Sequence, residues 1–324
     1  MSTVRTTIET IARPTAIAVP TGKTRNLWLD AGKRLVRNKA TVAGLVFVCL
    51  EIFVALAAPV IAPYGYTEHT SGATTQKPSH DHLLGTDAQG RDVLSRVIYG
   101  SRVSLTVGFV AEALILMIGV PLGLLAGFFG GWVDTLVMRF VDVMYAFPDI
   151  LLMITLMTYL KAKLPSVQSG WLLPVKAFYN ATGGMMGIFI ALALTSWLTL
   201  SRLVRGETLS IKRREYAEAA RSIGATNGRI MRHHVLPNIL APVIVSATIG
   251  VPAAILAEAG LSFIGLGVNP PTPSWGQMIS EGLTGLRSVP HLVLAPGVAL
   301  ALTVLSFNYI GDGLRDALDP RMKR

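Results

Sequence analysis

Residues 211–238 read IKRREYAEAARSIGATNGRIMRHHVLPN and form the most informative stretch of the chain. The segment is too polar to enter a membrane, yet its apolar residues recur at helical spacing. Gly224 follows them directly, where a helix commonly ends with a positive φ. Thr226 can cap a second short helix, and Pro237 suits the first turn of a following one. We therefore predict a helix, a glycine turn and a helix, with one apolar stripe made of Tyr216, Ala219, Ala220 and Ile223.

Two interpretations of this stripe remain open from periodicity alone. A small apolar face flanked by charges can dock into the groove of a partner protein. The same helix can instead lie on anionic membrane lipids, held by the eight basic residues between positions 202 and 232.

The composition of the whole chain points to a membrane protein. Of its 324 residues, 51% are hydrophobic and only 15% are charged, whereas a soluble domain carries roughly a quarter charged residues. This argues against a soluble globular enzyme and against a disordered chain. Cys49 is the single cysteine, so an intramolecular disulfide and a cysteine zinc cluster are excluded. Residues 1–39 are polar and basic and do not resemble a signal peptide.

Six segments are long and apolar enough to span a bilayer, which takes about 20 residues. They run over residues 40–62, 103–129, 136–160, 185–203, 239–266 and 292–310. The fold class expected is an all-α, polytopic membrane protein with six transmembrane helices. Gly119, Gly123 and Gly127 form GxxxG steps that favour tight helix packing.

The basic residues predict the orientation. With the N-terminus inside, 21 of the 29 Lys and Arg residues fall in or beside cytoplasmic segments and eight fall outside. Both termini are therefore expected in the cytoplasm. The net charge of +10 is then mainly a record of topology. No basic, aromatic-interleaved groove for nucleic acid is recognisable.

This topology divides the chain into four parts. A cytoplasmic tail (1–39) has a disordered stretch over about residues 1–25 and a short amphipathic interfacial helix over 26–39. The first transmembrane helix and an external loop follow (40–102). A core of five transmembrane helices (103–310) contains a cytoplasmic loop (204–238). A second cytoplasmic tail (311–324) ends the chain.

Three further stretches carry recognisable motifs. Residues 84–96 read LGTDAQGRDVLSR, residues 261–276 read LSFIGLGVNPPTPSWG, and residues 311–321 read GDGLRDALDPR. In the first, we expect Asp92 and Arg96 to pair at i, i+4. The favoured role of this motif is to order the external loop, and contact with an external binding protein is the alternative. Its residues are Asp87, Gly90, Arg91, Asp92 and Arg96.

Together with residues 211–238, these stretches resemble the ABC importer permeases of the dipeptide, oligopeptide and nickel family, and within it the C-type subunit. The string Glu218-Ala219-Ala220, then Gly224, then Leu236-Pro237 is similar to the EAA loop of that family. The resemblance implies a type I ABC importer permease fold in the cytoplasmic membrane, which transports by alternating access.

The resemblance also implies partners and roles. The expected partners are a homologous B-type permease subunit, two ABC ATPase subunits and an external substrate-binding protein. ATP and Mg²⁺ would be bound by the ATPase subunits, so this chain would need no cofactor and would not be an enzyme. The residues expected to couple it to an ATPase are Tyr216, Glu218, Ala219, Ala220, Gly224, Leu236 and Pro237. Peptide is the default substrate, and nickel, glutathione and short sugars are alternatives.

Charged residues inside the spans need partners or water. We expect Arg139 and Asp142 to pair at i, i+3. Asp149, just after Pro148, is a candidate pore-lining residue at a helix interruption. Glu258 is open to two interpretations, pore lining or buried hydrogen bonding.

Other chemistry finds little support in the sequence. A GKT triplet at residues 22–24 lacks the earlier glycine of a phosphate-binding loop, because position 17 is Ile17. His80 and His82 in the external loop form only a weak metal signal, and we predict no metal site. No catalytic constellation is recognisable. A stand-alone secondary transporter is the alternative from another class, although no clear repeat is present.

Overall fold

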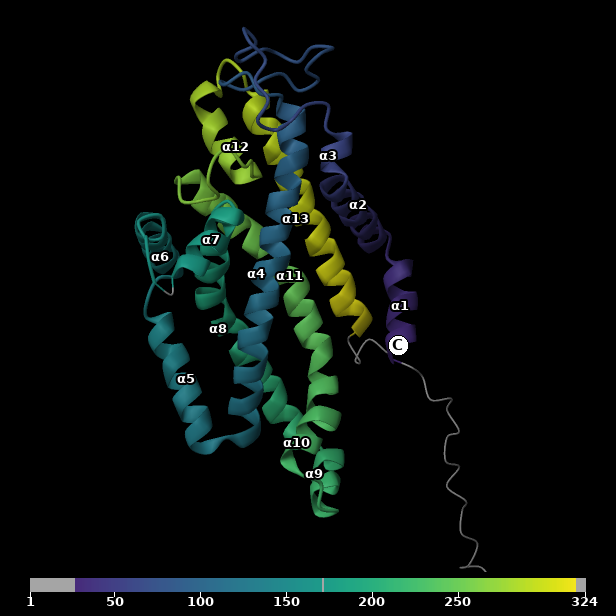
Figure 1. Ribbon diagram of the computed structural model, residues 1–324. Coiled ribbons are helices and arrows are strands. Elements are labelled where there is room, and N and C mark those ends of the chain that lie inside the picture. Colours follow the sequence, from purple (N-terminus) through teal and green to yellow (C-terminus); the bar gives the residue numbers. More distant parts are fainter. Residues whose placement is uncertain (1–26, 171, 319–324) are drawn as a thin grey trace, which may run out of the picture.

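The protein is described here by a computed structural model, which covers residues 27–170 and 172–318 (Figure 1). Among these residues the regular secondary structure is helical and no strand is present, which confirms the all-α fold. The segment expected to be disordered, residues 1–25, lies outside the described residues, as do residues 319–324 of the expected C-terminal tail.

Among the described residues, five helices are long and apolar enough to cross a membrane. They are α2 (Lys39–Leu56), α4 (Val93–Phe129), α8 (Met185–Lys212), α11 (Leu236–Phe263) and α13 (His291–Leu318). Short helices lie at the ends and along one flank of this bundle (Figure 1). They are α3 (Ala58–Ile61), α7 (Leu173–Ala181), α9 (Glu215–Ser222), α10 (Asn227–Ile230) and α12 (Trp275–Gly282), with a 3-10 turn at Leu283–Gly285.

The third expected span, residues 136–160, is not one straight helix. It is replaced by α5 (Gly131–Tyr145) and α6 (Asp149–Lys163), whose axes are bent by 82°. Pro148 explains the break, because a proline disfavours the helical conformation in the residue before it and here is the N-cap of α6. The described residues therefore contain up to six candidate spans, if this bent pair is counted as one.

Close packing of α4 against α8 forms the centre of the bundle. Gly119, Gly123 and Gly127 lie on the face of α4 that meets α8. A Cβ on Gly123 would collide with the carbonyl oxygen of Ser201 and come within 2.8 Å of Val204 Cβ. Small residues thus let the two backbones approach, as the GxxxG spacing predicts.

Several helices extend beyond the residue ranges expected for the spans. The external loop ends at Asp92 rather than at residue 102, since Asp92 caps α4 by accepting a hydrogen bond from Ser95 N at 2.7 Å. Residues 204–238, the loop predicted to be cytoplasmic, are helical over most of their length, and α8 continues to Lys212. The described part of the predicted tail 311–324, up to Leu318, belongs to α13.

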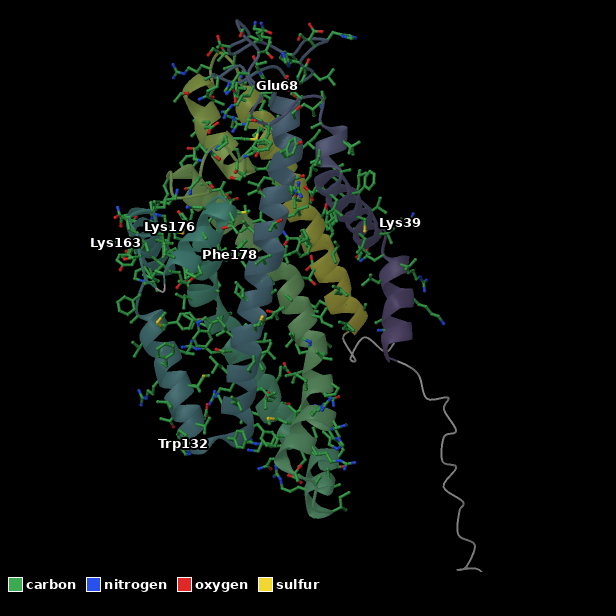
Figure 2. The ribbon with its side chains drawn as sticks, in the orientation of Figure 1. Lys39, Glu68, Trp132, Lys163, Lys176 and Phe178 are labelled. Atoms are coloured by element: carbon green, nitrogen blue, oxygen red, sulfur yellow. The ribbon has the colours of Figure 1, made fainter. Side chains whose placement is uncertain are left out.

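The two ends of the described chain meet. Helix α1 (Leu27–Arg37) corresponds to the expected amphipathic helix, and its Ala31 packs against Ala317 and Leu318 of α13. The external loop and α12 lie at one end of the bundle, and α9 and α10 lie at the other (Figure 1). Figure 2 shows Glu68 of the loop and Trp132 of α5 toward these opposite ends.

Candidate docking surface and membrane cleft

Helix α9 ends in the glycine turn that its sequence predicts. Gly224 has a φ of +82°. Its N–H donates to the Arg221 carbonyl at 3.0 Å, and the Ala225 N–H donates to the Ala220 carbonyl at 3.0 Å. This pair of bonds is a Schellman motif, which satisfies the last carbonyls of a helix. Thr226 then caps α10 by accepting from Arg229 N at 3.4 Å, so the chain reverses into a second helix.

The predicted apolar stripe of α9 is divided between two faces. Ala220 is buried in the core of this chain together with Ile230 and Val235. The prediction that Ala220 lies on one face with Tyr216, Ala219 and Ile223 is therefore wrong. Ala217, which the stripe omitted, is also buried. Tyr216 and Ile223 are exposed, with 42% and 87% of their surface accessible. We define the docking surface as the exposed residues Tyr216, Glu218, Ala219, Ile223 and Gly224.

The docking surface is joined directly to a membrane span. After α10 comes a π-helical turn, Met231–Val235, and α11 follows it without a break, so residues Asn227–Phe263 form one rod. Leu236 packs against the core and Pro237 occupies the first turn of α11. The Asn238 side-chain amide donates to the His234 carbonyl at 2.6 Å. A π-turn of this kind frequently lies at a functional site.

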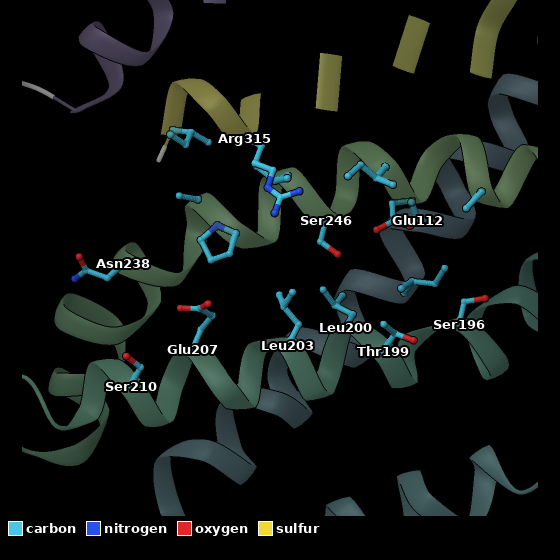
Figure 3. A pocket seen from close by; sticks show the side chains of 18 of the residues that line it. Glu112, Ser196, Thr199, Leu200, Leu203, Glu207, Ser210, Asn238, Ser246 and Arg315 are labelled. Carbon is cyan, nitrogen blue, oxygen red and sulfur yellow. The ribbon is translucent and has the colours of Figure 1, made fainter. Parts of the chain in front are cut away.

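A cleft of about 1110 Å³ runs between α8 and α11 (Figure 3). It reaches from Glu112 of α4, deep in the bundle, to Tyr216 and Pro237 beside the docking surface. Its polar lining includes Ser196, Thr199, Glu207, Asn238, Ser246 and Arg315. The cleft is thus a partly polar passage between membrane-spanning helices, which is large enough for a small solute.

The acidic residues of the spans differ in their surroundings. Glu258 is fully buried and accepts a hydrogen bond from Ser262 Oγ at 2.5 Å. It is not among the residues that line the cleft, so buried hydrogen bonding fits its position better than pore lining. Asp149 is exposed in the first turn of α6 and also lies outside the cleft lining. Glu112, which was not predicted as a site residue, lines it instead.

The pairing predicted for Arg139 and Asp142 is wrong. Asp142 accepts from Arg202 of α8 at 2.7 Å, and Asp134 of α5 makes a bidentate pair with Arg205 at 2.5 and 2.6 Å. These ion pairs join α5 to α8. Because spacing along one helix says nothing about a neighbouring helix, sequence reasoning could not identify the partners.

The external motif forms a compact charged cluster. Arg96, only 1% exposed, pairs with Asp87 at 2.6 Å and with Glu281 of α12 at 3.2 Å. Arg91 contacts the same two carboxylates at 2.7 and 3.1 Å. Burial raises the pKa of the Glu281 carboxyl, although Arg91 opposes this shift. The cluster ties the external loop to α4 and α12.

The expected pairing of Asp92 with Arg96 is wrong, because Asp92 bonds to His82 Nδ1 at 2.9 Å and caps α4. Gly90 has a φ of +75° and its N–H donates to the Asp87 carbonyl at 3.0 Å. Within residues 27–170 and 172–318, no group of three or more His, Cys, Asp or Glu residues is placed to hold a metal ion.

Comparison with known proteins identifies the family. The family model described as "Binding-protein-dependent transport system inner membrane component" matches residues 119–324. The chain belongs to this family. A second model, "N-terminal TM domain of oligopeptide transport permease C", matches residues 26–83. The protein is therefore a C-type permease and a multi-pass protein of the inner membrane, and such permeases act with other subunits of their transport systems.

Curated relatives cover nearly the whole permease. It is 43% identical over 296 residues to the dipeptide transport system permease protein DppC of Alkalihalophilus pseudofirmus, covering 91% of this chain and 90% of that protein. It is 37% identical to the oligopeptide transport system permease protein OppC of Bacillus subtilis, covering 93% and 92%. It is 38% identical to the glutathione transport system permease protein GsiD of Pectobacterium atrosepticum, covering 92% and 93%.

A solved structure supports the fold. The permease resembles a chain of the methionine ABC transporter MetNI, described in inward-facing conformations, with a TM-score of 0.52 and 20% sequence identity. The similarity covers 69% of the permease and 96% of that chain. The arrangement of helices is thus that of an ABC transporter permease.

Proposed function

We propose that this permease carries di- or oligopeptides into the cell by alternating access, as one subunit of an ATP-driven importer. A homologous B-type permease would complete the membrane pore, and an external binding protein would deliver the substrate. Two ABC ATPase subunits would bind ATP and Mg²⁺ and hydrolyse the ATP, so the permease itself would be no enzyme and would need no cofactor. Its two termini would lie in the cytoplasm, in keeping with the distribution of basic residues.

The exposed side of α9 is the observation that carries this proposal. Ala217 and Ala220 anchor the helix to the bundle, which leaves Tyr216, Ala219 and Ile223 facing outward. An aromatic and an aliphatic side chain beside a small residue suit docking in a partner's groove. A lipid-bound helix would instead require its apolar side to face the bilayer, whereas α9 lies at the tip of the bundle (Figure 1).

The rod that joins α10 to α11 offers a route for coupling. It begins beside the docking surface and continues through Ala241, Ser246 and Gly250, which line the cleft. A rigid helix that an ATPase displaces at one end therefore changes the width of the cleft at the other. An ATPase subunit that contacts the inward-open and the outward-open form of the permease differently would shift the equilibrium between these two forms.

The substrate class follows from the relatives. Two of those named above transport dipeptides or oligopeptides, and the third transports glutathione, which is itself a tripeptide. Glutathione is therefore the second candidate substrate. A binding assay of peptides and glutathione with the external binding protein that works with this permease would separate the two candidates.

The docking role is tested by placing a charge at Ile223. Because Ile223 is 87% exposed, Ile223→Asp should leave insertion and yield of the permease unchanged. Recovery of the ATPase subunits on the purified permease should fall about tenfold, as expected for loss of a central apolar contact. Ser222→Asp places the same charge one residue away and serves as the control. Normal ATPase recovery and normal peptide uptake by Ile223→Asp would contradict the proposal.

A further inference from the structure

Two acidic side chains of the described spans, those of Glu112 and Glu207, line the cleft, and Glu112 is the more deeply buried of the two. Glu112 of α4 lines it and is only 6% exposed. Within the described residues the structure gives its carboxylate no hydrogen bond and no ion pair. Glu51 and Glu258, the other two buried acids of the spans, each accept a hydroxyl hydrogen bond, from Thr303 and Ser262. Among these three acids, Glu112 is the one whose carboxylate has no hydrogen bond to any described residue, whereas Glu51 and Glu258 each have one oxygen paired and only Oε2 unpaired.

The wall of the cleft opposite Glu112 leaves room for its carboxylate. Gly250 of α11 lies against it, and a Cβ at this position would collide with both carboxylate oxygens and the carbon between them. Ser246, one turn away on α11, lines the same part of the cleft. Figure 3 shows Glu112 toward the Ser196 end of the cleft and Glu207 toward the Asn238 end, with Arg315 near the middle of the view.

A cation would stabilise a buried carboxylate that has no partner among the described residues. Burial of an unpaired charge at membrane depth is costly, and such residues generally mark the path of a substrate or an ion. Hydroxyl groups at Ser196, Thr199 and Ser246 supply further hydrogen-bond acceptors along the cleft. A primary ammonium, which has three donors and one positive charge, matches one carboxylate in a cleft that also carries hydroxyl oxygens.

We propose that Glu112 binds the ammonium group of the transported solute as it passes between α8 and α11. This inference rests on the proposed function, since a free N-terminal ammonium is what dipeptides, oligopeptides and glutathione have in common. The site selects for positive charge inside the permease itself, in addition to any selection made outside the membrane.

The first experiment measures the local charge without reference to transport. Ser246→Cys in a Cys49→Ser background leaves one thiol in this chain, on the wall of the cleft one turn from Gly250, and the complex is purified with its natural partner chains. The same complex without Ser246→Cys corrects for reaction at thiols of the partner chains. Cationic and anionic methanethiosulfonate reagents of similar size are compared. We expect the cationic reagent to react about tenfold faster, and Glu112→Gln to bring the ratio of rates near one. Glu51→Gln makes the same substitution outside the cleft and should leave the ratio unchanged.

The second experiment measures transport. The complex is reconstituted in ATP-loaded liposomes and supplied with trialanine on the external binding protein. Glu112→Gln should lower uptake about tenfold, as expected for loss of a charge-assisted hydrogen bond. Glu112→Asp keeps the charge and should retain part of the uptake. Gly250→Ala displaces the carboxylate without changing its charge, and should lower uptake as well.

The outcomes separate the two proposals. An unchanged reagent ratio in Glu112→Gln, or wild-type uptake of trialanine by this variant, would overturn the role of Glu112. An equal loss of complex assembly in Glu112→Gln and Glu51→Gln would also overturn it, because it would mark both acids as structural. If the wild-type complex imports neither trialanine nor glutathione, the peptide function fails, and the reagent ratio still decides whether Glu112 attracts cations.

Discussion

Gly224 shows how much one residue determines at the docking surface. Its φ of +82° lies in the left-handed region, where any residue with a Cβ is strained by roughly 1–2 kcal/mol. The Schellman bonds at this position end α9 and turn the chain into α10. No other atom lies within 4 Å of the place where a Cβ would be, so the demand for glycine comes from the backbone and not from crowding.

We predict that Gly224→Asp abolishes transport and leaves the complex poorly assembled. The substitution strains the turn by about 1 kcal/mol and adds a negative charge to the docking surface. Gly228→Asp is the matched control, because Gly228 is an exposed residue with open space around it and a helical backbone. Peptide uptake and recovery of the ATPase subunits are the measurements. Uptake by Gly224→Asp at the level of Gly228→Asp would refute the prediction.

At the scale of elements, the contact between α4 and α8 depends on glycines, which have no side chain. The backbone of α8 at Ser201 and Arg205 lies against Gly123 and Gly127 of α4. In lipid there is little hydrophobic gain from bringing helices together, so close van der Waals contact provides the stabilisation. This contact also sets the position of α8, which forms one wall of the cleft.

Gly123→Ala should therefore destabilise the permease by about 1–3 kcal/mol, the usual cost of overpacking. Gly206→Ala in α8 provides the comparison, because Gly206 is exposed and has open space around it. That substitution should be neutral or stabilising by up to about 1 kcal/mol, since alanine favours helix more than glycine does. Thermal unfolding in detergent measures both. Equal unfolding temperatures for the two variants would show that the helices are less tightly packed than described.

At the scale of the whole molecule, the bundle has two different ends. The charged cluster around Arg96 fixes the external loop at one end, and the docking surface lies at the other (Figure 1). The contact of Ala31 with Ala317 and Leu318 brings the two ends of the described chain to the same region. Because these two parts lie at opposite ends of the bundle, either orientation in the membrane would place them on opposite sides.

We predict that His80 of the external loop is reached from outside the cell and Ile223 only from inside. Each is replaced by cysteine in a Cys49→Ser background, as His80→Cys and Ile223→Cys. Both positions are exposed, so accessibility depends on the side of the membrane. A membrane-impermeant maleimide should label His80→Cys in intact cells and Ile223→Cys only after permeabilisation. The reverse pattern would invert the proposed orientation.

The sequence by itself determined the features that depend on local chemistry. Helix type, the glycine turn at Gly224 and the cap at Thr226 follow from residues close together in the chain. The GxxxG steps and the interruption at Pro148 were also readable, because small residues and prolines act on their own backbone. The motifs were sufficient to indicate the family.

Only the tertiary structure decided which charges meet. Asp142 and Arg96 have charged partners on other helices, and Asp92 bonds to His82 in the loop before α4 rather than to Arg96. The packing of the helices also decides which face of α9 is buried. It likewise decides that Glu112 lines the cleft and Glu258 does not. The physical reason is that helix formation is local, whereas the orientation of a helix is not. A helix repeats every 3.6 residues whichever way it is turned, and only the neighbouring helices decide which side faces a cleft, the core or water.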